Sequence, residues 1–174
     1  MSNGLRQISM SFVATEDRLL FRLKTRDNKE YRLFLTRRFV LLGLWPAIRS
    51  LLAADPAVRR MTNEAQKQTM LSFRHDGFVD KSAFEKTYEE TDVERPLGDG
   101  PVVVTGLKAV PSNGGYALTF KLIDGKTVAL RFDEKLMHNF CKLLFDLVNK
   151  ADWDVTIGFD TADGGHGTAT ARVH

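Results

Sequence analysis

The same order of predicted elements occurs twice along this chain of 174 residues. Residues 21–48 read as a strand, an Asp-Asn-Lys turn, a strand, a polar cap and an apolar helix, and residues 120–145 repeat that order. With one gap of two residues, the two stretches align at five positions: Phe21 with Phe120, Leu23 with Leu122, Asp27 with Asp124, Lys29 with Lys126 and Leu33 with Leu130. A repeat of this kind predicts a fold with two similar halves.

We therefore predict an α+β protein in which two similar β-β-β-α units, an internal duplication, form antiparallel sheets packed with helices. One globular domain is expected to span residues 1–174, because a chain of this length can bury a single core. Its parts are expected to be a first unit (5–55), a linking helix (56–77), an acidic connector (78–100), a second unit (101–151), and a short strand with a flexible tail (152–174).

Local signals place the ends of these elements. Thr36, Asp55 and Asp133 stand where helix N-caps belong, since their side chains can accept from the free N–H groups of the first turn. Pro46 lacks an N–H group and is expected to kink or divide the helix that begins near Arg37. Residues 155–159 are expected to form the short strand near the end of the chain.

The composition indicates a soluble protein of the cytoplasm. Hydrophobic residues make up 43% of the chain and charged residues 27%, as in ordinary globular domains. The single cysteine, Cys141, excludes an intrachain disulfide and favours a reducing compartment. No apolar stretch of secretory-signal type is found at the N-terminus, and the longest apolar run, 39–48, is about half the length that a membrane helix needs. We expect no membrane partner.

Charge is distributed unevenly, although the net charge is only +3. Residues 1–60 carry twelve Lys and Arg against five Asp and Glu, whereas residues 61–100 carry five against nine. A basic half beside an acidic segment can attract a polyanion or a partner of complementary charge. Alternatively, the two segments neutralise each other within the fold.

A possible anion site follows from two arginines at a predicted helix start. The helix dipole disfavours cations there, so a phosphate held by the cap N–H groups and the guanidinium groups would explain their presence. Alternatively, both arginines extend into solvent or pair with the acidic connector. The candidate residues, including three cations on the outward face of the preceding hairpin, are Thr36, Arg37, Arg38, Arg22, Lys24 and Arg32.

The first predicted helix is apolar on nearly all sides and must be buried on more than one of them. It packs either between the two halves of the fold or against a second copy of the chain. For the second alternative, Trp45 is the expected anchor. The possible interface residues are Trp45, Leu41, Leu44 and the outward-facing Phe34, which is otherwise a stacking surface for a base.

No pattern predicts catalysis, a metal or a cofactor. His138 and Cys141 are three residues apart on a helix, but no second pair with zinc spacing accompanies them, so a buried thiol is the expected state of Cys141. The sequence contains no nucleophile elbow, phosphate loop or His-Glu-x-x-His motif. We predict no catalytic residues.

Four short runs resemble a family of uncharacterised bacterial proteins, chiefly proteobacterial. The runs are Ile8-Ser9-Met10-Ser11, Asp17-Arg18-Leu19-Leu20, Leu35-Thr36-Arg37-Arg38 and Leu44-Trp45-Pro46. The resemblance covers the chain from about Gln7 to Trp153 and implies no activity, cofactor or catalytic residue.

These observations together predict a non-catalytic, cytoplasmic binding or assembly module that self-associates as a homodimer or binds a protein partner. The first alternative is a module that binds nucleic acid or a phosphate ligand through its basic N-terminal half. The second is an enzyme whose site the sequence does not reveal.

Overall fold

The computed structural model describes residues 4–79, 87–88, 90 and 92–159. Its strands form one six-stranded sheet in the order of the sequence. They are β1 (Leu5–Val13), β2 (Arg18–Thr25), β3 (Glu30–Thr36), β4 (Val102–Ser112), β5 (Gly115–Leu122) and β6 (Thr127–Asp133). The helical segments are α1 (Arg37–Phe39), the π-helix η1 (Val40–Leu44), α2 (Trp45–Ala53), α3 (Pro56–Arg59), α4 (Glu64–Phe78) and α6 (Glu134–Ala151).

The sheet is mixed, so the predicted α+β class is confirmed but the prediction of purely antiparallel sheets is wrong. Strands β1–β3, the first trio, form one antiparallel meander, and strands β4–β6, the second trio, form another. The two trios join through a parallel pairing of β3 with β4. Leu33 pairs there with Val102, and Phe34 pairs with Val103. The long connection between these strands permits the parallel pairing, which a short hairpin cannot produce.

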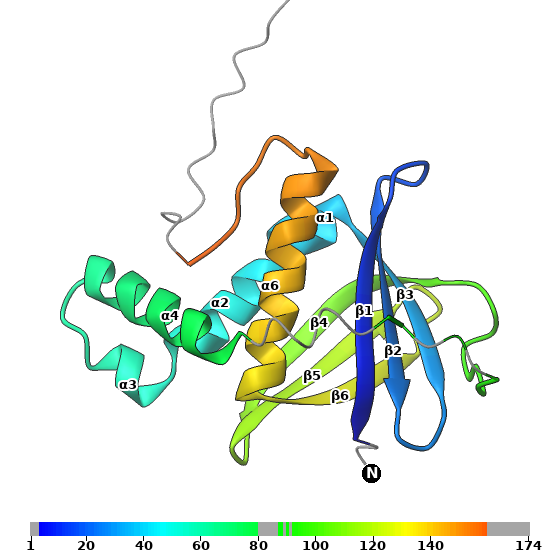
Figure 1. Cartoon of the computed structure of the whole chain (residues 1–174), viewed down its shortest axis with the longest axis horizontal. Helices are drawn as coiled ribbons and strands as arrows, with labels where there is room; N and C mark the ends of the chain where they lie inside the picture. The colour runs from blue at the N-terminus through cyan, green and yellow to red at the C-terminus, as the bar shows by residue number, and fades with distance from the viewer. Residues whose placement is uncertain (1–3, 80–86, 89, 91, 160–174) are drawn as a thin grey trace, which may run out of the picture.

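The helices pack crosswise over the two trios (Figure 1). α2 follows the first trio but packs against β4 of the second, whereas α6 follows the second trio and packs against β1 of the first. α4 contacts α2 and α6 and lies on their far side from the strands (Figure 1). No helix among the described residues is long and apolar enough to cross a membrane.

One hydrophobic core serves both trios. The ring of Phe21 on β2 lies 6.2 Å from that of Phe120 on β5 and 5.2 Å from that of Phe140 on α6. All three side chains are fully buried. Removal of such rings from water is the main stabilising term for a domain of this size.

One predicted division of a helix is found in the structure, and two predicted elements differ from it. The helix around Pro46 is divided as expected. The division is a π-helical turn before α2, which places Pro46 in the first turn of α2, where its missing N–H group is not needed. The predicted helix over 56–77 is two helices, because Asn63 caps a new start by accepting from the N–H of Gln66. Residues 155–159 form no strand. The predicted flexible tail from residue 160 lies outside the described residues, as do residues 80–86, 89 and 91 of the connector.

The second and third strands of the two trios correspond in length and in hairpin geometry. A shift of 97 residues carries the bounds of β2 onto those of β5, and the bounds of β3 onto those of β6. Both hairpins close with the same bond, from the N–H of Thr25 to the carbonyl of Lys29 and from the N–H of Leu122 to the carbonyl of Lys126, each at 2.9 Å. A left-handed residue precedes each closing lysine: Asn28 with φ of 62° and Gly125 with φ of 84°.

The first strand of each trio is related by a shift of 99 residues instead. Leu5 pairs with Thr25 as Val104 pairs with Leu122, and both pairings are followed by a one-residue bulge. The difference of two residues lies in the turns, because β1 and β2 are joined by 14–17 whereas β4 and β5 are joined by 113–114. The predicted pairing of Phe21 with Phe120 is therefore out of register by two residues; Phe21 corresponds to Leu118.

Candidate functional site

The predicted basic residues of the first hairpin are covered by the connector. Tyr88 lies over Arg22 and Lys24, with its ring centre 4.2 Å from the guanidinium carbon and 4.6 Å from the ammonium nitrogen. Arg32 donates to the carboxylate of Glu30 at 3.2 Å. These three cations are thus brought together, but around an aromatic ring and a carboxylate of the same chain rather than around an open anion site.

The rest of the predicted anion site is used within the fold. Thr36 accepts from the N–H of Phe39 at 3.1 Å and so caps α1, while Arg37 donates to the carbonyl of Trp153 at 2.8 Å. Arg38 is exposed. No phosphate-sized arrangement of free donors follows from these contacts.

The predicted interface residues lie mainly inside the chain. Leu44 is fully buried and Trp45 is 6% exposed, with its ring 4.9 Å from that of Phe145 on α6. Leu41 and Phe34 are half-buried. The structure therefore favours the first of the two alternatives for Trp45 and Leu44, burial within the fold, and it leaves Leu42, which is 65% exposed, as the apolar residue that this helix presents to solvent.

His138 and Cys141 lie in the core as well. Nδ1 of His138 is 3.2 Å from Nδ1 of His75, and Cys141 is fully buried. Burial raises the pKa of the Cys141 thiol, so the thiolate that a metal requires is disfavoured. Among the described residues no cluster of three His, Cys, Asp or Glu side chains could hold a metal ion.

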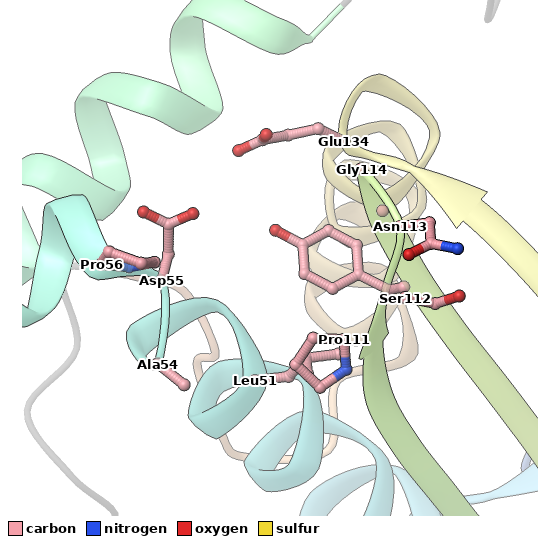
Figure 2. A pocket seen from close by; sticks show the side chains of 11 residues that line it. Leu51, Ala54, Asp55, Pro56, Pro111, Ser112, Asn113, Gly114 and Glu134 are labelled. Atoms are coloured by element: carbon pink, nitrogen blue, oxygen red, sulfur yellow. The ribbon is translucent and has the colours of Figure 1, made fainter.

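A pocket of about 290 Å³ lies where the end of α2 meets the turn between β4 and β5 (Figure 2). One wall is the stretch that leads from α2 into α3, and the other is the β4–β5 turn with the beginning of α6. The lining residues are Leu51, Ala54, Asp55, Pro56, Pro111, Ser112, Asn113, Gly114, Gly115, Tyr116 and Glu134. This mixture of apolar walls with a few polar groups is typical of small-ligand sites.

Two carboxylates face the same space from opposite walls. Figure 2 shows the side chains of Asp55 and Glu134 pointing toward one gap. Arg74 of α4 bridges them, with Nη1 at 2.8 Å from Oδ1 of Asp55 and Nη2 bonded to Oε1 of Glu134. Two carboxylates meet one guanidinium in this cluster, and a second guanidinium, that of Arg131, donates to the carbonyl of Asn113 on the wall of the pocket.

The charge of Asp55 is held in place by its neighbours. Burial opposes ionisation, but the N–H of Ala57 and the guanidinium of Arg74 both bond to the carboxylate and lower its pKa. Asp55 is therefore a capping residue and a fixed anion at neutral pH. It is poorly suited to donate a proton, because a general acid needs a raised pKa.

Tyr116 is the most unusual residue of the pocket. Its side chain is only 7% exposed, and among the residues that the structure describes no group forms a hydrogen bond with its hydroxyl. Burial, and then the charge of Glu134, raise the pKa of Tyr116 to about 12. The hydroxyl thus stays protonated and offers a hydrogen-bond donor to the pocket.

Two glycines shape the wall beside Tyr116. Gly114 has φ of +74°, and a Cβ atom there would meet nothing within 4 Å. A Cβ atom on Gly115 would lie 2.3 Å from the carbonyl oxygen of Phe132, so this position requires glycine. The turn can therefore lie close against β6 and open toward α3.

Sequence reasoning missed this pocket. In the sequence, Asp55 indicates a helix start, which the structure contains, and nothing relates it to the turn after Pro111. The end of α2 lies near the β4–β5 turn because α2 packs on β4, and no local sequence pattern predicts that packing. Asp55 and Glu134 are acidic residues at helix starts, and the sequence indicates no further role for either of them.

Comparisons with known proteins add no relative: no family model matches the chain, and searches of curated proteins and of solved structures return no significant match.

Proposed function

We propose that this protein is a non-catalytic binding module and that the pocket between α2, α3 and the β4–β5 turn is its ligand site. The observation that carries the proposal is Tyr116, a residue only 7% exposed that lines the pocket and whose hydroxyl forms no hydrogen bond with the described residues. A bound ligand would supply the missing hydrogen bond.

Binding is favoured over catalysis by the charges of the site. Asp55 stays ionised and Tyr116 stays protonated at neutral pH, so neither group is poised to move a proton. The alternative of nucleic-acid or phosphate binding has less support, because Tyr88 and Glu30 already engage three of the five proposed basic residues. A protein partner in the cytoplasm, or a second copy, remains the proposed source of the ligand, and the single cysteine supports a reducing compartment.

The two β-β-β-α units are also proposed to derive from one ancestral unit. Support comes from the shift of 97 residues that relates β2–β3 to β5–β6, the equal hairpin closures, and the equivalent caps Thr36 and Asp133. Identical element order alone is weak support, since antiparallel hairpins recur in unrelated folds. Matching bulges and left-handed positions are more specific.

The test is a fragment screen by ¹H–¹⁵N spectroscopy on the intact protein. Ligands of the pocket should shift the amide signals of Asn113, Gly114 and Tyr116. Tyr116→Phe should lower the affinity for these ligands about three- to tenfold through loss of one hydrogen bond. Tyr31→Phe, on β3 of the other trio, is the matched control and should change nothing. If no fragment at millimolar concentration shifts these amides, the pocket is not a ligand site.

A further inference from the structure

Trp153 lies beside the β1–β2 turn of the first trio, at the place that corresponds to the pocket beside the β4–β5 turn of the second trio. It follows α6 and is 2% exposed. Its indole Nε1 donates to Oδ1 of Asp17 in the β1–β2 turn at 2.6 Å, its ring meets the ring of Phe12 edge-on at 6.3 Å, and its carbonyl accepts from Arg37. An indole therefore closes the corner where the helix of one unit meets the first turn of the other.

The pocket is the same corner in the second trio. The shift of 97 residues carries Asp17 onto Gly114, Arg37 onto Glu134 and Trp153 onto Pro56, and the shift of 99 residues that relates β1 to β4 carries Phe12 onto Pro111. All four counterparts line the pocket: Gly114, Glu134, Pro56 and Pro111.

The two corners differ in what they contain. A tryptophan with its acceptor stands in the first, whereas proline and glycine stand at the matching positions of the second. The left-handed backbone is kept, with φ of 50° at Asp17 and 74° at Gly114, so the turn is preserved while the side chains are lost. The space of about 290 Å³ is what remains where the first trio holds an indole ring.

We propose that the pocket takes a flat aromatic ring that carries an N–H donor and a positive charge, an indole-type amine, seated as Trp153 is seated in the first trio. This rests on the proposed function, since it names the ligand class of the same site.

The polar groups of the pocket select among aromatic ligands. Asp55 and Glu134 meet only one guanidinium, that of Arg74, in the cluster between α3 and α6, so a cation is favoured over an anion on that side of the pocket. Leu51, Pro56 and Pro111 supply apolar walls for the ring. The ring N–H can donate to the hydroxyl oxygen of Tyr116, which has no other partner among the described residues.

The experiment titrates the intact protein with tryptamine, indole-3-acetate and cyclohexylamine, followed by the amide signals of Gly114 and Tyr116. We expect tryptamine to bind at least about tenfold more tightly than the anion, which is disfavoured, and than the saturated amine, which cannot stack. A peptide that begins with tryptophan keeps both the indole and an ammonium group, and binding of this peptide as tight as that of tryptamine would indicate a polypeptide as the natural source. N-acetyltryptophanamide lacks the charge and should bind more weakly than either.

Two variants test the correspondence itself. Gly114→Asp restores the acceptor of the first trio at a position with free space and in the left-handed region that Asp17 also occupies, with φ of 74° against 50°, and it should tighten tryptamine binding about three- to tenfold. Pro56→Trp should fill the pocket and abolish binding. Ile123→Trp, at a 68% exposed turn position of the β5–β6 hairpin, is the matched control and should bind as the wild type does.

Equal affinity for cyclohexylamine and tryptamine, or no gain in Gly114→Asp, would overturn the indole assignment while the pocket remained a binding site. A lack of shifts with all of these compounds, when other fragments do bind there, would overturn it as well. The proposed function would fail separately, through the absence of any pocket ligand in the fragment screen.

Discussion

The indole of Trp153 donates to the carboxylate of Asp17 at 2.6 Å, and this bond joins two residues that are 136 positions apart in the sequence. It fixes the end of α6 against the β1–β2 turn. The bond is partly buried and has an ionised acceptor, which places it among the stronger hydrogen bonds of the fold.

Trp153→Phe should therefore lower the free energy of unfolding by about 2 kcal/mol, since it keeps most of the ring but leaves Asp17 without its donor. Trp153→Ala should cost about 3–5 kcal/mol because it also empties the corner. Urea unfolding followed by circular dichroism measures both. A phenylalanine variant as stable as the wild type would show that the hydrogen bond contributes nothing.

Two glycines make a matched pair for testing backbone packing. Gly115→Ala should destabilise the protein by about 2–3 kcal/mol or more, because its Cβ would lie 2.3 Å from the carbonyl oxygen of Phe132 and force β5 away from β6. Gly77→Ala, in α4 with nothing within 4 Å, should instead stabilise by about 0.5–1 kcal/mol. Thermal unfolding of the two variants should shift in opposite directions, and a common direction would contradict this account.

Local chemistry made part of the fold predictable. The caps Thr36, Asp55 and Asp133 all accept from N–H groups two or three residues on, as their side chains predict. The turns around Asn28 and Gly125 are hairpins for the same reason, since both residues tolerate the left-handed region. These features depend on neighbours within one turn, so the sequence alone contains the necessary information.

The arrangement of the two trios was not predictable in this way. The parallel pairing of Leu33 with Val102 joins strands separated by a long connection, and the packing of α2 on β4 depends on that pairing. Alternation of apolar residues says which face of a strand is buried, but not which strand lies beside it. The pocket results from this crosswise packing, and no sequence motif predicts it.

Glu30 illustrates a buried charge that sequence reasoning overlooked. Its carboxylate is 3% exposed and accepts from the hydroxyl of Tyr88 at 2.9 Å, from Nε of Arg95 at 2.9 Å and from Nε of Arg32 at 3.2 Å. Burial opposes ionisation, but the hydrogen bonds from Arg95 and Tyr88 and the charge of Arg32 lower the pKa of Glu30. The charged form is thus the form that the fold stabilises.

Glu30→Gln should lower the free energy of unfolding by about 2–4 kcal/mol, because it removes the negative charge that pairs with the guanidinium groups of Arg32 and Arg95. Glu90→Gln is the matched control: Glu90 pairs with Arg22 at 3.4 Å, but its side chain is 81% exposed, so the change should stay within about 0.5 kcal/mol. Denaturant titration of both variants tests the contrast. Similar losses would mean that burial of Glu30 does not decide its contribution.

His138 should make the stability depend on pH between about 4 and 6.5. Burial, and then the charges of His75 and Arg74, lower the pKa of His138 to about 4, whereas in the unfolded chain it is near 6.5. The unfolded state then binds more protons in this range. Stability is therefore full above about pH 6.5 and falls as the pH drops toward 4, by about 3 kcal/mol in all.

His138→Asn separates this contribution from that of the carboxylates. Asparagine places an amide near the position of Nδ1, which lies 3.2 Å from Nδ1 of His75, but it does not titrate. Between pH 7 and 5, above the range in which most carboxylates protonate, the variant should lose less stability than the wild type in urea unfolding. Equal slopes for the two proteins would show that His138 is already charged in the folded state or that another group carries the pH dependence.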